Sequence, residues 1–126
     1  MENSNNIYFS KEHTWLKIEN KTGTVGITDF AQGELGEIVY VDLPTIGDEF
    51  KQDEVLGSVE ALKTVSDLFM PVAGEILEIN EELMDNPTFV NDNPFDKGWM
   101  VKIKIEDLDE VSNLLNSEDY KKLIEK

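Results

Sequence analysis

The chain has 126 residues, a length that fits one domain with one moderate hydrophobic core. Its 27 Asp plus Glu against 11 Lys plus Arg give a net charge of −16, which repels nucleic-acid backbones and anionic membrane surfaces. The absence of cysteine excludes disulfides, thiolate nucleophiles, zinc–thiolate sites and iron–sulfur clusters, so any redox sulfur must come from a bound group. We therefore expect a single domain over residues 1–126, with no nucleic-acid and no membrane partner.

The N-terminal segment, Met1–Asn6, contains no apolar signal core and no Arg-rich amphipathic stretch. Nowhere in the chain do about eighteen apolar residues run together, as a membrane-spanning helix requires. These features predict a cytoplasmic protein.

The first regular elements are two β-favouring stretches, Thr14–Ile18 and Thr24–Ile27, separated by the turn-like segment Asn20–Gly23. They predict a hairpin. Thr28 and Asp29 then offer an N-cap for a helix that Gly33 and Gly36 limit to about two turns.

Further short strands are expected over residues 38–41, 55–62, 65–70, 76–79 and 99–103, with turns at 44–47 and 71–74. Strict alternation along residues 55–62 places Val55, Gly57, Val59 and Ala61 on one face. Residues 80–98 read as loop and turns, because Asn-Pro occurs twice there and Asp96-Lys97-Gly98 ends the segment. So many short strands between turn signals predict a sandwich or a flattened barrel.

Two strand segments resemble each other. Gly36–Val41 (GEIVYV) recurs 38 residues later as Gly74–Ile79 (GEILEI), which is consistent with two similar half-sandwiches with Lys63 between them. A chance match of a six-residue strand pattern is the alternative.

The C-terminal segment changes to a helical period, because Val111, Leu114 and Leu115 fall on one helical face. Ser117 is placed as an N-cap ahead of Tyr120. One or two short helices are therefore expected to close the domain.

Lys63 lies between two β-favouring stretches that have no Gly, Asn or Pro at their junction, and it should occupy the tip of a hairpin. A modifying enzyme needs an amine that projects from a rigid, exposed turn. Most exposed turn lysines are unmodified, so the setting alone does not identify a site.

The segment around Lys63 resembles the lipoyl-lysine site of glycine cleavage H proteins, with Ser58-Val59-Glu60 before the lysine and Ser66-Asp67 after it. More matches follow in the order and spacing of that family: His13 with Trp15, residues 26–32, 35–38 and 71–76, and Gly98-Trp99-Met100 with Lys102. The resemblance covers about Tyr8 to Tyr120.

This resemblance implies a mainly β fold, a lipoyl/biotinyl-type barrel-sandwich of two antiparallel sheets with a short internal helix and a C-terminal helical segment. It implies a non-catalytic, monomeric carrier in which Lys63 bears lipoate as N6-lipoyllysine. The implied partners are the pyridoxal-dependent glycine decarboxylase (P protein), the aminomethyltransferase (T protein) and dihydrolipoyl dehydrogenase (L protein). A lipoate ligase or a lipoyl/octanoyl transferase would attach the cofactor.

Carboxylates near the loaded arm are expected to hold its cationic amine by a charge-assisted hydrogen bond. Asp67 is the first candidate. The family commonly has a glutamate between the His and the Trp of the N-terminal motif, but this chain has Thr14 there. Glu12, two residues earlier on the same side of an extended strand, could supply the missing acid, the alternative being a solvated surface glutamate.

Other readings have less support. Biotin domains typically flank their lysine with methionines, whereas Lys63 lies between Leu62 and Thr64. Lipoyl domains of oxo-acid dehydrogenases commonly have Asp-Lys-Ala at the site and are joined by flexible linkers to a catalytic domain. An H-like relay protein that donates lipoyl groups to other enzymes stays open because of Thr14.

Catalytic and metal sites are not expected. The lone histidine, His13, is interpreted as a hydrogen-bonded structural residue, and no nucleophile-elbow pattern surrounds any serine. The oxygen-rich cluster of Asn91, Asp92, Asn93 and Asp96 lacks the spacing of a calcium loop and is interpreted as a turn.

Overall fold

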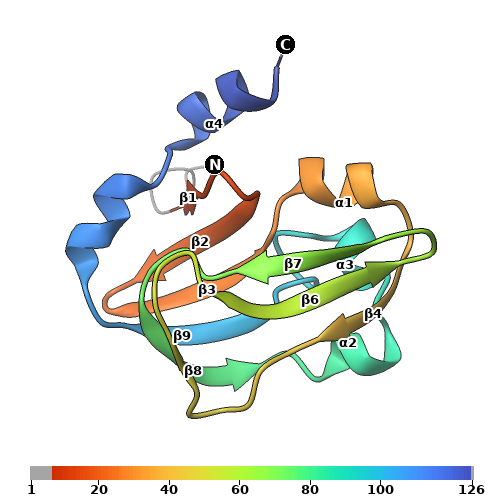
Figure 1. The fold of residues 1–126 in the computed structure, drawn as a ribbon, viewed down its shortest axis with the longest axis horizontal. Helices are drawn as coiled ribbons and strands as arrows, with labels where there is room; N and C mark the ends of the chain where they lie inside the picture. The colour runs from red at the N-terminus through yellow and green to blue at the C-terminus, as the bar shows by residue number, and fades with distance from the viewer. Residues whose placement is uncertain (1–6, 126) are drawn as a thin grey trace.

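The computed structural model describes residues 7–125, which form two antiparallel β-sheets and several short helices (Figure 1). One sheet has six strands in the order β1-β2-β3-β9-β8-β5, and the other has three strands in the order β4-β6-β7. The strands are β1 (Ile7–Phe9), β2 (Thr14–Glu19), β3 (Thr22–Ile27), β4 (Ile38–Asp42), β5 (Glu49–Phe50), β6 (Val55–Ala61), β7 (Val65–Phe69), β8 (Gly74–Ile79) and β9 (Val101–Ile105). The expected architecture of two antiparallel sheets is confirmed.

The helices are α1 (Asp29–Leu35), α2 (Glu82–Asp85), α3 (Phe89–Asp92), the 3₁₀ helix η2 (Leu108–Asn113) and α4 (Ser117–Ile124). The internal helix α1 begins as predicted, because the Thr28 hydroxyl accepts a hydrogen bond from the Ala31 amide. It ends at Gly36, whose φ of 85° favours glycine. Gly33 lies within the helix and does not end it. None of the helices in residues 7–125 is long and apolar enough to span a membrane.

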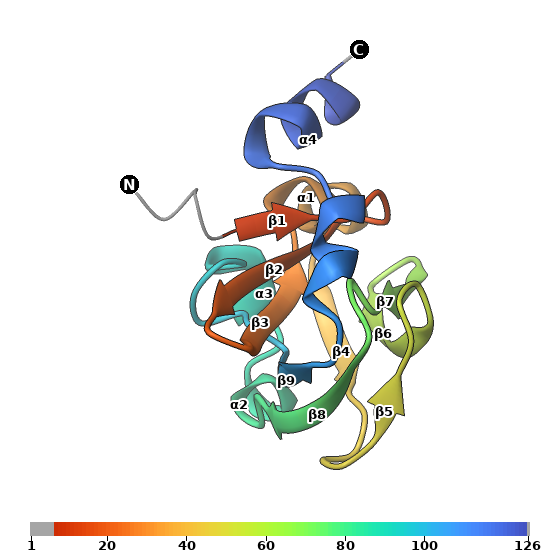
Figure 2. The same cartoon turned by 90° about the vertical axis from the view of Figure 1, so that its left-hand side faces the viewer.

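The main hydrophobic core lies between the two sheets. It includes fully buried side chains from both of them: Leu16, Val25, Ile76 and Ile103 from the six-stranded sheet, and Ile38, Val41, Val59 and Leu68 from the three-stranded sheet. A second cluster, made of Phe9, Trp15 and Tyr120, packs α4 against β1 and β2 (Figure 2). The sandwich and the C-terminal helix are therefore held by separate apolar contacts.

The predicted alternation along β6 holds for Val59 and Ala61 but is wrong for Val55. Val55 is 46% exposed, Leu56 is buried in its place, and the pairing of β6 with β7 shifts between Val55 and Gly57. Gly57 allows a close approach to β4, because a Cβ at this position would collide with the Asp42 carbonyl oxygen. The irregularity changes which face each side chain occupies.

The two similar segments have the same irregularity in the structure. The register of β4 shifts between Ile38 and Tyr40, and that of β8 shifts between Ile76 and Glu78, the equivalent positions. In both strands a fully buried isoleucine is followed by two exposed residues. Shared geometry in addition to shared sequence supports the internal repeat.

Residues 80–98, expected as loop and turns, contain α2 and α3. Each helix has only four residues and one fully buried side chain, Leu83 in α2 and Val90 in α3. A single apolar contact in four residues gives no helical period, which is why the sequence pattern did not reveal them.

The C-terminal segment differs from its prediction in two ways. Val111 lies in η2, but this 3₁₀ helix ends before Leu114, and Leu115 forms a β-bridge with Phe9. The N-cap of α4 is Asn116, whose side chain accepts from the Asp119 amide at 2.7 Å, and Ser117 is the first helical residue.

The strands β1 and β5, of three and two residues, were not expected.

Candidate functional site

Lys63 lies in the tight turn between β6 and β7, at the right-hand end of the sheet in Figure 1. The Ala61 amide donates to the Thr64 carbonyl at 2.8 Å, so only Leu62 and Lys63 form the turn. The Leu62 amide donates to the Glu37 carbonyl at 3.2 Å, which ties the turn to the start of β4. Leu62 is 69% exposed and Lys63 is also exposed. The prediction that Lys63 occupies a hairpin tip is confirmed.

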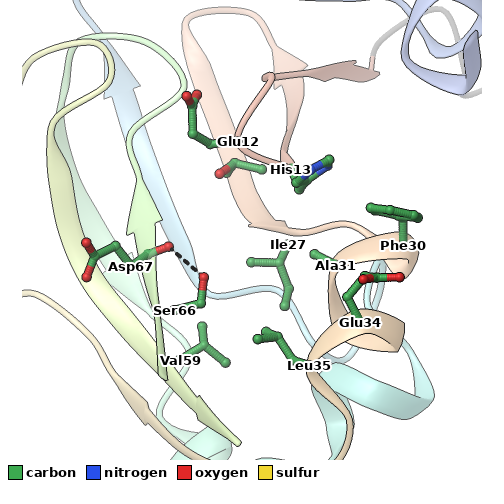
Figure 3. Close-up of a pocket in the computed structure, with 11 residues that line it drawn as sticks. Glu12, His13, Ile27, Phe30, Ala31, Glu34, Leu35, Val59, Ser66 and Asp67 are labelled. Carbon is green, nitrogen blue, oxygen red and sulfur yellow. Dashed lines mark hydrogen bonds between the residues drawn. The ribbon is translucent and has the colours of Figure 1, made fainter. Parts of the chain in front are cut away.

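A cleft of about 260 Å³ lies beside this hairpin (Figure 3). Helix α1 forms one wall, β6 and β7 form the opposite wall, and the β1–β2 turn with the start of β2 borders it between them. Its lining residues are Glu12, His13, Thr14, Ile27, Phe30, Ala31, Glu34, Leu35, Val59, Ser66 and Asp67. Ile27, Leu35 and Val59 make part of the lining apolar, while carboxylates and hydroxyls supply its polar groups.

Helix α1 presents four of these residues because of its period. Phe30 and Glu34 are separated by one helical turn, as are Ala31 and Leu35, so the four side chains share one side of the helix. Asn91 fixes the end of the helix: its amide nitrogen donates to the Gln32 side chain at 2.8 Å and to the Gly36 carbonyl at 2.9 Å. The same side chain accepts from the Ile38 amide at 2.9 Å, so it joins α1 to β4.

A chain of hydrogen bonds runs from the cleft to the C-terminal helix. His13 Nδ1 lies 2.7 Å from the Tyr120 hydroxyl, which lies 2.7 Å from Thr28 Oγ1, and Thr28 caps α1. The Tyr120 hydroxyl therefore joins the imidazole of His13 to the residue that caps α1. The expected hydrogen bond of His13 is confirmed, and its φ of 69° places it in the left-handed region.

The electrostatics of the cleft centre on His13. Burial lowers the pKa of its imidazole below the ordinary value of 6.5, and the nearby carboxylates of Glu12 and Glu34 partly oppose this shift. Burial also raises the pKa of the Tyr120 hydroxyl, an effect that its hydrogen bond with Thr28 partly offsets. The imidazole is therefore neutral at pH 7, with negative charge on either side.

The structure places the three predicted arm-holding residues around this cleft in different settings. Asp67 lies on β7, and its carboxylate points away from the other lining side chains (Figure 3), whereas the neighbouring Ser66 hydroxyl donates to the Asp67 carbonyl at 3.4 Å. Glu12 belongs to the β1–β2 turn, so the expectation that it shares an extended strand with Thr14 is wrong. Thr14 is buried and donates to the Phe69 carbonyl at 3.1 Å, which links β2 to β7.

Several lining residues were not singled out from the sequence. Phe30, Glu34 and Leu35 could have been found from the four-residue spacing behind the Thr28 cap. Ser66 pairs with the buried Val59, and that register becomes visible only once the hairpin is known. Tyr120 lies 107 residues from His13, so no local pattern connects the two.

The arrangement suits a long acyl chain attached to Lys63. The lysine amine is open to an approaching enzyme. Ser66 of the cleft lining follows Lys63 by three residues, which is roughly 10 Å along an extended chain. The apolar part of the cleft can pack hydrocarbon, and Glu12 and Glu34 supply acidic groups to its lining. Among residues 7–125 no group of three or more His, Cys, Asp or Glu side chains could hold a metal ion.

Comparisons with known proteins point to one family. The family model for glycine cleavage H-protein matches residues 7–126. The glycine cleavage system H protein of Staphylococcus carnosus is 53% identical over 116 residues, 92% of each chain, and that of Halalkalibacterium halodurans is 49% identical over 120 residues, 95% of this chain and 94% of the other.

The crystal structure of a glycine cleavage system H protein from Mycobacterium marinum superposes with a TM-score of 0.83 at 30% identity, over 93% of this chain and 94% of the other. The expected lipoyl/biotinyl-type barrel-sandwich is thereby confirmed. The chain belongs to the glycine cleavage H-protein family.

Proposed function

We propose that this chain is the lipoyl carrier of a glycine cleavage system, with lipoate bound as an amide to Nζ of Lys63. The observation that carries the proposal is the exposed Lys63 on a two-residue turn beside a partly apolar cleft. Bound lipoate supplies the sulfur chemistry that a chain without cysteine lacks. The protein's own contribution is to position the arm and to shelter its end, without catalysing a reaction itself.

The proposed partners are the P protein, which loads the aminomethyl group of glycine, the T protein, which passes its one-carbon unit on, and the L protein, which reoxidises the dithiol. A lipoate ligase or a lipoyl/octanoyl transferase attaches the cofactor. Residues 1–126 act as one carrier domain, since a single core joins both sheets. The proposed carrier is monomeric and cytoplasmic.

Peptide mapping of protein from lipoate-replete cells tests the attachment site. We expect the lipoyl mass on Lys63, and we expect Lys63→Arg to abolish loading while leaving the urea midpoint unchanged, because the turn is exposed. The lipoyl mass on another lysine, or no modification at all, would contradict the proposal.

The carboxylates are proposed to hold the cationic end of the loaded arm. Asp67 is the first candidate because it lies four residues after Lys63, although its carboxylate points away from the other lining side chains (Figure 3). Glu12 is the second candidate and lies near His13 in the cleft lining. A hydrogen bond to a charged group contributes about 1.5–3 kcal/mol, enough to change the fraction of docked arm about ten-fold or more. Loss of the relevant acid should therefore expose the loaded arm to water.

The test compares spontaneous release of formaldehyde and ammonia from the loaded wild type, Asp67→Asn, Glu12→Gln and Thr14→Glu. Release should quicken in Asp67→Asn and, where Glu12 compensates, in Glu12→Gln. Release should slow in Thr14→Glu if this variant keeps its fold. Urea unfolding checks the fold, because the substitution removes the hydrogen bond from Thr14 to the Phe69 carbonyl. Unchanged release in Asp67→Asn would show that packing or backbone groups hold the arm.

A lipoyl relay role is the second candidate, favoured by Thr14 at the position where the family commonly has a glutamate. The lipoyl domain of an oxo-acid dehydrogenase has less support, because the H-protein family model matches residues 7–126. Glycine-dependent exchange of bicarbonate with the P protein distinguishes carrier from relay. Lipoyl transfer to other enzymes without glycine exchange would favour the relay.

A further inference from the structure

Helix α1, which forms one wall of the cleft, has little packing of its own to hold it in place. Its seven residues, Asp29–Leu35, include no buried side chain, and Ala31 and Leu35 pack against the main core from partly buried positions. A helix this short is not stable by itself, and most helical stability in proteins comes from packing of an apolar face. The position of this wall therefore depends on contacts at the two ends of the helix.

The two ends of α1 are held by side chains from distant segments. At the C-terminal end, the side-chain amide of Asn91 bonds to the helix. At the N-terminal end, the Thr28 hydroxyl accepts from the Ala31 amide at 3.1 Å and lies 2.7 Å from the Tyr120 hydroxyl. Tyr120 belongs to α4 and lies 92 residues from Thr28. The C-terminal helix thus reaches the cap of the cleft wall.

The same hydroxyl holds the turn that borders the cleft. The Tyr120 oxygen lies 2.7 Å from Nδ1 of His13 in the β1–β2 turn. The φ of His13 is 69°, a conformation that a residue with a side chain keeps where surrounding contacts fix it. The Thr28 amide donates to the His13 carbonyl at 3.1 Å, so the turn and the cap are also joined directly. We name His13, Thr28 and Tyr120 the Tyr120 joint.

The packing around the Tyr120 ring fixes the position of its hydroxyl. The side chain is buried and stacks on Phe9, with ring centroids 4.7 Å apart and an angle of 13° between the rings. Trp15 completes this cluster. Thr28 is buried as well, so loss of the Tyr120 hydroxyl would leave its Oγ1 without this partner. The joint is therefore a fixed link between α4 and two borders of the cleft.

We propose that Tyr120 is a positioning residue for the lipoyl arm: its hydroxyl holds the α1 wall and the His13 turn at the separation that shelters the loaded arm. This inference rests on the proposed function. Tyr120 does not line the cleft, so it acts on the arm through His13 and the cap of α1. The C-terminal helix thereby controls a cleft whose lining residues lie between positions 12 and 67.

The coupling between the joint and the arm limits the size of the effect. Tyr120 can shift the equilibrium between docked and free arm by no more than the free energy of its hydrogen bonds. Loss of one such bond corresponds to about a two- to twelve-fold change in an equilibrium constant. We expect Tyr120→Phe to quicken spontaneous release of formaldehyde and ammonia from the loaded arm within that range.

A second measurement uses the unmodified chain and needs no cofactor. Native-state hydrogen exchange followed by NMR reports the Ala31 amide, which bonds to Thr28 Oγ1. This amide lies in the first turn of a short helix and should exchange through local opening of α1. In Tyr120→Phe its protection should fall about two- to twelve-fold, because the cap has lost its link to α4.

Ile105→Ala is the matched control for lost stability. Ile105 is buried in β9 and its side chain lies beside Gly23, near the start of β3, whereas Thr28 follows the opposite end of β3. The truncation should lower the urea midpoint at least as much as Tyr120→Phe does. Release from the loaded arm and exchange of the Ala31 amide should both keep their wild-type rates. Urea unfolding shows that each variant is folded under the assay conditions, and intact mass shows that each is loaded.

The outcomes separate positioning from general stability. Equal release in Tyr120→Phe and the wild type would refute the proposal, and so would equal acceleration in Ile105→Ala. Faster release without faster exchange of the Ala31 amide would also refute it, because the α1 wall would not have loosened. In each of these cases a wild type loaded at Lys63 leaves the carrier function standing. A wild type that is not loaded at all would overturn the carrier function and this inference with it.

Discussion

Replacing Tyr120 with phenylalanine tests the hydrogen-bond chain that joins the C-terminal helix to the cleft. The substitution keeps the ring that stacks on Phe9, with centroids 4.7 Å apart, and removes only the hydroxyl that lies 2.7 Å from both His13 Nδ1 and Thr28 Oγ1. Each lost hydrogen bond contributes about 0.5–1.5 kcal/mol, and the two groups left behind are partly or fully buried. We expect a loss of about 2 kcal/mol in the free energy of unfolding.

The assay is urea unfolding at pH 7.5 with thermal unfolding beside it. For a domain of this size, about 2 kcal/mol lowers Tm by roughly 6–10 °C. Tyr40→Phe is the matched control, because the Tyr40 side chain is half exposed, and it should stay within about 0.5 kcal/mol of the wild type. A Tyr120→Phe protein that unfolds with the wild type would refute the claim that this hydroxyl anchors α4 to the cleft.

Three further predictions follow from local geometry and charge. The lowered pKa of His13 means that the unfolded chain binds more protons below about pH 6.5, so stability should fall as pH decreases from 8 to 5.5, and His13→Gln should remove that part of the slope in the urea midpoint. Gly57→Ala should lower the free energy of unfolding by about 1–3 kcal/mol, because the new Cβ meets the Asp42 carbonyl. Gly33→Ala should raise it by about 0.5–1 kcal/mol, because this helical position has open space around it. Equal unfolding midpoints would contradict both expectations. The association rate of the carrier with the P protein should fall as ionic strength rises, since screening weakens steering by a net charge of −16, and a rate independent of salt in stopped-flow would show that the acidic excess is only a solvated surface.

The Lys63 hairpin could be predicted because its signal is local. Apolar and β-branched residues on both sides of the lysine give strands, and the resemblance around Lys63 extends over most of the chain. Helix α1 was equally accessible, since Thr28 is a cap residue and Gly36 adopts a positive φ at the opposite end. In both cases the decisive residues lie within a few positions of one another.

The cleft could not be predicted in the same way, because its walls come from distant parts of the chain. Its His13 wall depends on Tyr120, and its α1 wall depends on Asn91, which the sequence pattern suggested only as part of a turn. The register shifts in β4 and β6 are set by backbone contacts between strands, so alternation assigned Val55 to the wrong face. Contacts between residues that are far apart in the sequence decide these features, and sequence periodicity does not reveal such contacts.

The equivalent bulges in β4 and β8 give the molecule an internal pseudo-symmetry that its surface does not share. The exposed position filled by Tyr40 in one half is filled in the other by Glu78, which pairs with Lys102 across the strands. If both halves descend from one ancestral unit, the duplicated chain carried two equivalent exposed positions, those now filled by Tyr40 and Glu78. One of these positions now holds an aromatic side chain, on the sheet whose hairpin carries Lys63, while the other holds a charged one. The exposed positions could then diverge after duplication without altering the core, where the inward isoleucines Ile38 and Ile76 are alike in the two halves.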